Sequence, residues 1–314
     1  MKKLLSIVMV LAMMLALAGC SGSGSTELKM ATGGTSGTYY GFSGVIAQTL
    51  NEKLADKLNI TVESTGASKA NIQMIEIGES QLAIVQNDVM YYAYSSTDMF
   101  AGETPSTEFS AVASCYPEIV QIIANDSVQS IEDLKGKKVS VGDAGSGVEF
   151  NARQILAAYG ISFDDIIVNN QSFADSSDSL KNGTIDAAFI VAGTPTTAVT
   201  ELSSTYDFNI LEVDDEHIAA LQKDYSFFTK SVIPAGTYSC VNEDKQTVSV
   251  MATIIARNDV SEDVIYEFTK GLFEYKGEFS HAKAEELNLE TAVSGISIPF
   301  HPGAEKYYKE VGAK

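Results

Sequence analysis

The sequence predicts an α/β protein with two similar lobes and a ligand cleft between them. Short apolar strands alternate with helices whose apolar residues recur with a period near 3.6. Each half of the chain also carries a glycine-rich turn between a strand and a helix, and both halves continue through the same order of elements. The 314 residues exceed about 150 residues per domain, so two domains are expected.

In the first half, we expect a strand at 27–32 and a glycine-rich turn at 33–37. A helix follows, and its apolar positions are Phe42, Val45, Ile46, Leu50, Leu54 and Leu58. A strand at 60–64, a helix at 68–78 and a buried strand at 82–85 complete this set.

In the second half, we expect a strand at 138–142, a glycine-rich turn at 143–147 and a helix that closes at Gly160. The remaining elements are a strand at 166–168, a short helix ending at Gly183 and a buried strand at 187–190. Alternation alone occurs in any α/β protein. The recurrence of the glycine-rich turn, and of a Gly-x-x-Gln/Asp segment before each buried strand, favours paired lobes.

Composition narrows the classes of protein. The apolar fraction of 45% and the charged fraction of 20% are ordinary for a globular chain, which argues against disorder and against a polytopic membrane protein. The net charge is −20, from 41 acidic and 21 basic residues. Because phosphate binding needs a basic face, we expect no nucleic-acid partner.

The N-terminus has the pattern of a lipoprotein signal peptide over residues 1–19. Two lysines precede an apolar run that is shorter than the roughly 20 residues of a spanning helix. The run ends in Leu-Ala-Gly-Cys, which resembles a bacterial lipobox, so Cys20 is the expected lipidation site. Plain secretion is the alternative. Residues 20–26 then form a Gly/Ser tether, and no later segment has 18 consecutive apolar residues. The expected location is extracytoplasmic, on a lipid anchor.

The other two cysteines are Cys115 and Cys240. An extracytoplasmic compartment permits a disulfide, but two buried free thiols are the favoured interpretation. No cysteine or histidine spacing is typical of a zinc site, and we expect no metal and no cofactor.

Polar residues gather where the expected strands end, at 33–37, 65–68, 86–88, 142–147 and 192–195. In open α/β sheets, ligands bind beyond the carboxyl ends of the strands. Each glycine-rich turn opens a helix, whose N–H groups and dipole suit an anion. Thr38 and Ser146 offer hydroxyl donors, and Tyr39 or Tyr40 should face the cleft. A tight strand-to-helix turn without a ligand is the alternative for each glycine cluster.

Enzyme chemistry is poorly supported. The chain has three histidines and lacks both a phosphate-binding loop motif and a nucleophile elbow at a strand–helix turn. Asp88 is a candidate catalytic carboxylate, although a strand-end aspartate more often caps a helix. The acidic run 214–216 is more typical of a helix start than of a metal site, and His301 of a structural loop residue.

Several segments together resemble the TAXI receptors, the solute-binding proteins of tripartite ATP-independent periplasmic (TRAP) transporters. They are ATGGTSGTYY at 31–40, VESTG at 62–66, VQND at 85–88, DLKGK at 133–137, GSG at 145–147, IPAGTY at 233–238 and PFHPG at 299–303, followed by YYKE at 307–310. The resemblance extends from about residue 28 to the C-terminus.

The resemblance implies a two-lobed periplasmic-binding-protein fold of type II-like architecture, whose cleft closes on a ligand. Residues 111–124 and 238–257 would be the strands that cross between the lobes. Lobe one would then comprise 27–114 plus 247–314, and lobe two 115–246. Hinges at the crossings would let the cleft close.

The resemblance also implies a function, namely capture of a small carboxylate such as glutamate, glutamine or 2-oxoglutarate and delivery to an ion-gradient-driven TRAP permease. A monomer is expected. Carried over by position, the ligand shell comprises Thr35, Tyr39, Tyr40, Thr65, Ser68, Gln86, Asn87, Ser146, Gly147, Val148 and Thr194. Gly34, Thr38 and Pro195 lie in the same loops and are included. Asn87, where many members carry serine, and the segment 194–196 depart from the family pattern.

Two rival functions stay open at this stage. The same fold serves as the ligand-binding input module of membrane sensor kinases. A lipoprotein hydrolase acting on small amides would need a catalytic group such as Asp88.

Overall fold

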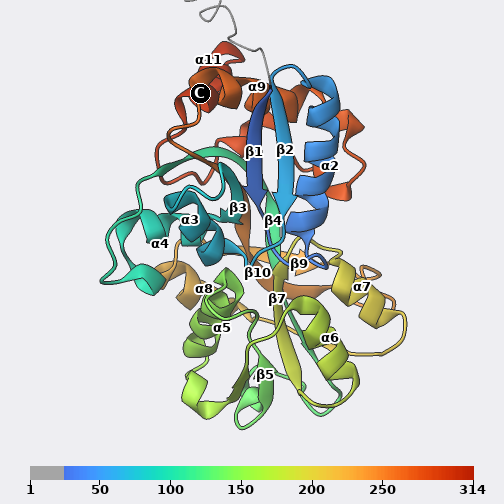
Figure 1. Ribbon diagram of the computed structural model, residues 1–314. Coiled ribbons are helices and arrows are strands. Elements are labelled where there is room, and N and C mark those ends of the chain that lie inside the picture. Colours follow the sequence, from blue (N-terminus) through green and yellow to red (C-terminus); the bar gives the residue numbers. More distant parts are fainter. Residues whose placement is uncertain (1–24) are drawn as a thin grey trace, which may run out of the picture.

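Two groups of parallel strands, joined by two long antiparallel strands, form the framework of the computed structural model, which describes residues 25–314 (Figure 1). All of the strands belong to one ten-stranded sheet. The principal order is β2-β1-β3-β10-β4-β7-β5-β6, with β8 beside β4 and β9 beside β10. The predicted α/β class is therefore correct.

The first group has β1 between β2 and β3, and both pairs are parallel. Parallel neighbours need a crossover connection, and α2 and α3 provide it. The elements are β1 (Thr26–Ala31), α2 (Thr38–Lys53), β2 (Leu58–Glu63), α3 (Ser68–Glu76), β3 (Leu82–Gln86) and α4 (Asn87–Ser95). Because β1 begins at Thr26, the strand takes in the last residue of the expected tether.

Two strands carry the chain between the groups. They are β4 (Phe109–Ala124) and β10 (Lys245–Arg257), which pair antiparallel with each other. One part of β10 also pairs with β3, and one part of β4 pairs with β7. These strands match the expected crossing segments, although the return strand begins at Lys245 rather than 238.

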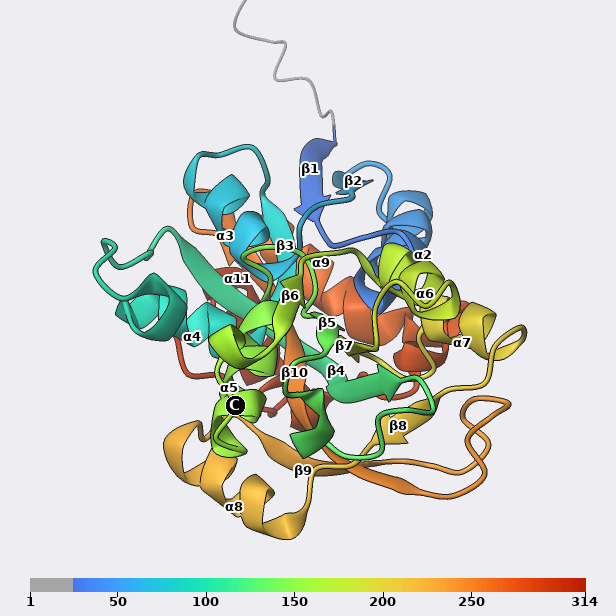
Figure 2. The same cartoon turned by 90° about the horizontal axis from the view of Figure 1, so that it is seen from below.

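The second group has β5 between β6 and β7 in parallel, so it repeats the arrangement of the first (Figure 1). Its elements are β5 (Lys138–Ser140), α5 (Gly147–Ala158), β6 (Ile167–Asn169), α6 (Phe173–Lys181), β7 (Ala187–Ala192) and α7 (Thr197–Ser203). Then follow β8 (Asn209–Leu211), α8 (Asp215–Asp224) and β9 (Thr229–Ile233). Figure 2 shows α8 and β9 at one side of this half.

The C-terminal helices return to the first half. They are α9 (Glu262–Glu274), α10 (Leu289–Ala292) and α11 (Pro302–Glu310). Phe268 and Leu272 of α9 and Tyr308 of α11 share a buried cluster with Phe42 and Leu50 of α2. Burial of such large apolar side chains stabilises the fold by about 1.5–3 kcal/mol each.

The buried apolar residues divide between the two halves. The buried residues of two clusters lie within residues 28–116 and 252–308 of the chain. Those of the other two clusters lie within residues 119–250. Val248 and Val250 pack in the second half, although they follow the predicted boundary at 247, because β10 runs continuously through both halves. The exact lobe boundaries stay a prediction.

Four helix ends differ from expectation, and two of them are α5 and α6, which end at Ala158 and Lys181 rather than at Gly160 and Gly183. The first helix ends at Lys53 rather than continuing to Leu58, which instead begins β2. Leu54 and Leu58 are both buried, so their spacing reflects a shared core and not a shared helix. The helix expected at 68–78 ends at Glu76, and Gly78 adopts a positive φ of 78° just beyond it.

The expected signal peptide and Cys20 lie outside the described residues. Within residues 25–314, no helix is long and apolar enough to cross a membrane. Cys115 and Cys240 are free thiols, as favoured. Only Cys115 is fully buried, and burial raises its pKa to about 12; Cys240 is partly exposed because it lies in a loop before β10.

Candidate ligand-binding site

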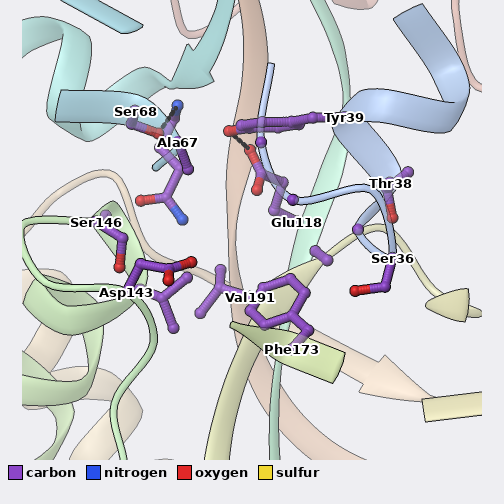
Figure 3. Close-up of a pocket in the computed structure, with 17 residues that line it drawn as sticks. Ser36, Thr38, Tyr39, Ala67, Ser68, Glu118, Asp143, Ser146, Phe173 and Val191 are labelled. Atoms are coloured by element: carbon purple, nitrogen blue, oxygen red, sulfur yellow. Dashed lines mark hydrogen bonds between the residues drawn. The ribbon is translucent and has the colours of Figure 1, made fainter. Parts of the chain in front are cut away.

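A small cavity of about 50 Å³ lies where the two halves meet (Figure 3). Its walls come from the ends of β3 and β7, the middle of β4, and the turns that open α2, α3, α5 and α6. The lining residues are Gly33, Gly34, Ser36, Gly37, Thr38, Tyr39, Ala67, Ser68, Gln86, Glu118, Asp143, Ser146, Gly147, Val148, Phe173, Val191 and Ala192. Because residues of both halves enclose it, the cavity suits a small molecule rather than a polymer.

Eight of the fourteen predicted ligand residues line this cavity. They are Gly34, Thr38, Tyr39, Ser68, Gln86, Ser146, Gly147 and Val148. Their elements are far apart in sequence, and the fold brings them together because strand ends from both halves face one central space. Tyr39 is the member of its tyrosine pair that faces the cleft.

The other six predicted residues do not line the cavity. Thr35 and Pro195 are exposed, and Tyr40 and Thr194 are half-buried. Thr65 holds its own loop, because its hydroxyl bonds to Thr32 O at 3.0 Å and to Asn71 Oδ1 at 2.5 Å. The carbonyl oxygen of the Asn87 side chain accepts from Met251 N–H at 3.0 Å and so fastens α4 to β10. These residues were predicted from the loops in which they lie. Position in a loop does not determine the direction in which a side chain points.

Glu118 is the principal site residue that the sequence did not reveal. It lies in the middle of β4, is 2% exposed, and accepts a hydrogen bond from the Tyr39 hydroxyl at 2.5 Å (Figure 3). Burial raises the pKa of Glu118 well above its usual range, and burial together with the nearby Glu118 raises that of Tyr39. The one charged residue in this buried crossing strand is the feature that could have identified it.

Two further lining residues are not among the fourteen predicted ones. Asp143 follows β5, and burial together with Asp175 raises its pKa. Phe173 opens α6 and places its ring beside Val191 at the floor of the cavity (Figure 3). The lining residues include two carboxyl groups, Glu118 and Asp143, but no lysine or arginine.

Gln86 reaches across the cleft from the end of β3. Its side-chain oxygen is buried without a hydrogen-bond partner among the described residues. A Cβ atom at Gly147 would lie 1.8 Å from that oxygen, so any side chain there would displace the Gln86 side chain or hold α5 away from it. A buried unpaired acceptor costs about 1–3 kcal/mol, and a ligand donor would remove that cost.

The two glycine-rich turns present their helices differently. At α5, Ser146 accepts a hydrogen bond from Glu149 N–H at 3.2 Å, and the Glu149 carboxylate accepts from Gly145 N–H at 2.6 Å. At α2, the N-cap is Gly37, no side chain caps the helix, and its first turn has no acidic residue. The α2 terminus is therefore the one that offers its N–H groups to an anion.

Direct contacts bridge the halves beside the cavity. The Thr38 hydroxyl donates to Gly193 O at 2.9 Å, and Ala198 N–H donates to Ser36 O at 3.3 Å. On another side, Asn151 Nδ2 of α5 donates to the Asp88 carboxylate of α4 at 2.9 Å. The structure therefore represents a closed arrangement of the two halves.

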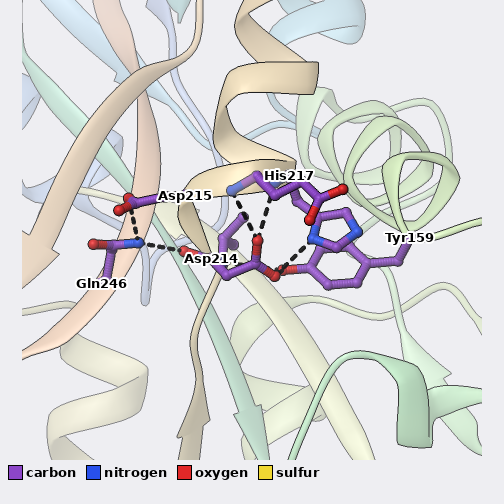
Figure 4. Close-up of polar contacts among 7 residues, drawn as sticks. Tyr159, Asp214, Asp215, His217 and Gln246 are labelled. Carbon is purple, nitrogen blue, oxygen red and sulfur yellow. Dashed lines mark hydrogen bonds and ion pairs between the residues drawn. The ribbon is translucent and has the colours of Figure 1, made fainter.

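The candidate metal and catalytic groups have structural roles. Asp214 caps α8, accepts from His217 N–H at 3.1 Å and lies 2.6 Å from the His217 ring (Figure 4). The imidazole stacks on Tyr159 at 3.5 Å between centroids. His301 is buried and caps α11. Among residues 25–314, no group of three or more His, Cys, Asp or Glu is arranged to hold a metal ion.

Solved structures with the same architecture define the class of fold. One is described as a periplasmic transporter; it is 15% identical, covers 93% of this chain and 94% of its own, and has a TM-score of 0.55. Another is the alkanesulfonate-binding protein SsuA from Xanthomonas axonopodis pv. citri, solved with MOPS. It is 14% identical, covers 91% of this chain and 84% of its own, and has a TM-score of 0.51. The chain has the periplasmic-binding-protein fold, and neither description is of an enzyme.

The sequence comparison gives the family. The sequence model of the NMT1-like family matches residues 30–312, so the chain belongs to that family. The match covers both halves and every residue that lines the cavity.

Proposed function

We propose that this protein is an extracytoplasmic receptor that captures a small amino-acid-like carboxylate by closing its two halves and delivers it to a membrane permease. The observation that carries the proposal is the cavity between the halves. It combines an uncapped α2 terminus, the unpaired Gln86 oxygen and the buried Glu118 carboxyl group. These groups supply donors for a carboxylate and acceptors for a positive or N–H group.

The charge of the cavity favours an α-amino acid over a dicarboxylate that lacks an amine. A ligand carboxylate fits the N–H groups at the start of α2, where no acidic side chain competes. An ammonium group fits beside Glu118 and offsets the cost of burying that carboxylate. Within the expected set of ligands, glutamine and glutamate therefore rank above 2-oxoglutarate, which has no amine.

The proposed partner is a TRAP permease driven by an ion gradient, and it rests on the resemblance of the sequence to TAXI receptors. The proposed attachment is a lipid on Cys20, with the protein acting as a monomer. The second candidate is an input module for a sensor kinase. The fold is compatible with both roles, so the partner must be identified by experiment.

The ligand proposal is tested by thermal unfolding of residues 26–314 with L-glutamine, L-glutamate, 2-oxoglutarate and succinate. A ligand at 100 times its dissociation constant adds about 2.7 kcal/mol. At about 2–4 °C per kcal/mol, the midpoint should rise several degrees with an amino acid. A rise with 2-oxoglutarate or succinate alone would contradict the role of Glu118.

Glu118→Gln gives the matched test of the ammonium site. It removes the charge but keeps the shape, so amino-acid binding should weaken about tenfold or more. Glu201→Gln alters an exposed glutamate of α7 and should bind as the unmodified protein does. If no compound shifts the midpoint, mass spectrometry of the denatured protein will reveal any ligand retained through purification.

The partner is tested in membranes. Solute uptake that requires this protein and an ion gradient, and continues without ATP, supports the TRAP assignment. Recovery of a histidine kinase on cross-linking would favour the sensor. Hydrolysis of glutamine that is lost in Asp88→Ala would instead support the rival hydrolase function. For the anchor, Cys20→Ala should release the protein from the membrane fraction.

A further inference from the structure

A second set of contacts joins the halves outside the cavity, between α4 and α5 (Figure 1; Figure 2). Asn151 Nδ2 donates to Asp88 Oδ2 at 2.9 Å. One turn further along α5, Gln154 Nε2 donates to Asp98 Oδ2 at 3.1 Å and to the Tyr92 hydroxyl at 3.3 Å. We call these five residues the α4–α5 clasp. None of them lines the cavity.

The clasp is shielded from water except at Asp98, which lies exposed at its edge. Asp88 is 1% exposed, Asn151 0% and Gln154 4%. Phe227, from the segment after α8, packs against Tyr92 with ring centroids 5.9 Å apart and covers this side. A buried carboxylate that depends on a donor from the opposite half is costly to form.

Among residues 25–314, no lysine, arginine or histidine pairs with Asp88. The titratable groups that face it are Asp98 from the turn after α4, Tyr92 from α4 itself, and Glu118 from β4. Tyr225, from the segment after α8, lies near Tyr92 and Asp98. Arg153 of α5 instead contacts Glu149 at 3.6 Å and covers the Phe163 ring. The clasp therefore consists of acidic and neutral side chains and contains no basic one.

We propose that Asp88 and Asn151 form a proton-sensitive clasp that sets how readily the two halves close. Asp88 and Asn151 are positioning residues, because they act on the arrangement of the halves and do not touch the cavity. The inference concerns closure itself and does not depend on which ligand the cavity takes.

The sign of the effect follows from the two environments of Asp88. In the closed form, burial raises the pKa of Asp88 to about 6, although the hydrogen bonds from Asn151 and Val89 oppose this. When α5 withdraws, water returns and the pKa falls toward about 3.9. The closed form then binds the proton more tightly, so acidification favours closure and a rise in pH favours opening.

The size of the effect follows from the same two values. With a pKa of about 6 when closed and about 3.9 when open, the closed-to-open ratio rises about tenfold from pH 7 to pH 5. Glu118 is also buried with a raised pKa, so it contributes a pH response of its own. The test must therefore be made in a Glu118→Gln background.

The measurement is the distance between nitroxide labels on the two halves, by pulsed electron paramagnetic resonance, with no ligand added. Labels go on Ile77→Cys beyond α3 and Ile167→Cys in β6, which are 69% and 54% exposed. Cys240→Ser removes the accessible native thiol, and Cys115 is buried. The short-distance fraction reports closure.

In the Glu118→Gln background, the ratio of short to long distances should rise about tenfold from pH 7 to pH 5. Adding Asp88→Asn should remove most of that rise, leaving the smaller response of Asp143, and keep the protein mostly closed at both pH values. The substitution preserves the packing, because the unpaired Asn151 oxygen can turn to accept from the new amide. An equal pH response with and without Asp88→Asn, or no response at all, would overturn the proposal.

A second variant covers a failure of Asp88→Asn to fold. Asn151→Ala removes the donor that stabilises the charged carboxylate in the closed form only. Closure should therefore weaken at pH 7 and depend on pH more steeply. Asn182→Ala, at an exposed residue after α6, should leave both properties unchanged. A shallower pH response in Asn151→Ala would count against the clasp. Because no ligand is used, these outcomes are independent of the proposed receptor function.

Discussion

The glycine-rich turns before α2 and α5 occupy equivalent places in the two halves, yet they leave different helix termini for a ligand. In the turn before α5, the Ser146 hydroxyl and the Glu149 carboxylate accept hydrogen bonds from backbone N–H groups at the start of that helix. Those N–H groups are therefore not available to a ligand. The turn before α2 has glycine at the N-cap and a threonine and two tyrosines in the first turn. Of these two helix starts, a ligand carboxylate is therefore expected at α2, although the glycine pattern is common to both.

The largest effect on ligand binding is expected for Gly37→Asp, which gives α2 an acidic N-cap like the acidic start of α5. Aspartate is a preferred N-cap, and the backbone at Gly37 (φ −94°, ψ 167°) accepts it. The new carboxylate would occupy the free N–H groups and repel a ligand carboxylate. Amino-acid binding should fall by about a hundredfold, as measured by calorimetry, while unfolding stability changes by less than about 0.5 kcal/mol.

Gly37→Ser is the matched control, because it caps the same N–H groups without a charge. Its loss of affinity should be about tenfold, since only the hydrogen bonds compete. Equal affinities for Gly37→Asp and the unmodified protein would show that the ligand carboxylate lies elsewhere.

The next largest effect is expected at Gly147, where α5 approaches Gln86. A methyl group there would lie 1.8 Å from Gln86 Oε1, so Gly147→Ala must displace that side chain or hold the halves apart. We expect about tenfold weaker amino-acid binding from the lost contact, read by the same titration.

Gly44→Ala in α2 supplies the comparison for Gly147. A Cβ atom there meets nothing within 4 Å. The substitution should leave affinity unchanged and raise unfolding stability by up to about 1 kcal/mol, because alanine favours helix. Weaker binding in Gly44→Ala, or normal binding in Gly147→Ala, would contradict the close approach of α5.

Ser146→Ala removes the side chain that caps α5 and so tests whether this helix start is stabilised by its own residues. Loss of an N-cap costs about 1 kcal/mol of unfolding free energy, measurable by urea denaturation without ligand. Ser146→Thr should retain most of the stability. An unchanged denaturation midpoint for Ser146→Ala would mean that the serine does not cap α5.

Glu149→Gln has the smallest expected effect. It keeps a hydrogen-bond acceptor for Gly145 N–H but removes a negative charge both from the positive end of α5 and from the contact with Arg153. Stability should fall by about 0.3–1 kcal/mol at low salt, and the difference should shrink as salt rises. A difference that is independent of salt would point to packing rather than to the helix dipole.

The fold was predictable because its periodicity is local. Strand β3, helix α2 and the buried strand β7 follow from apolar patterns within each segment. The helix end at Lys53 was not predictable in this way, because Leu54 and Leu58 continue the apolar spacing while facing the same core from a turn and a strand.

The site was predictable to the extent that strand ends converge in an α/β sheet. This rule placed Gln86, Ser146 and Gly147 correctly at the cavity. It did not identify Glu118, because that residue is in mid-strand and reaches the cavity only where β4 passes between the halves. Nor did it exclude Thr65, whose hydroxyl binds its own loop.

The sequence by itself determined the α/β class, the repeated order of elements and the capped start of α5, because each depends on residues within a few positions of one another. The tertiary structure alone decided which polar groups share the cavity. It also decided that Asp88 and Asn151, in opposite halves, are buried together as a clasp. Burial and partner choice depend on residues distant in sequence, and these set both the charge of the cavity and the pKa of Asp88.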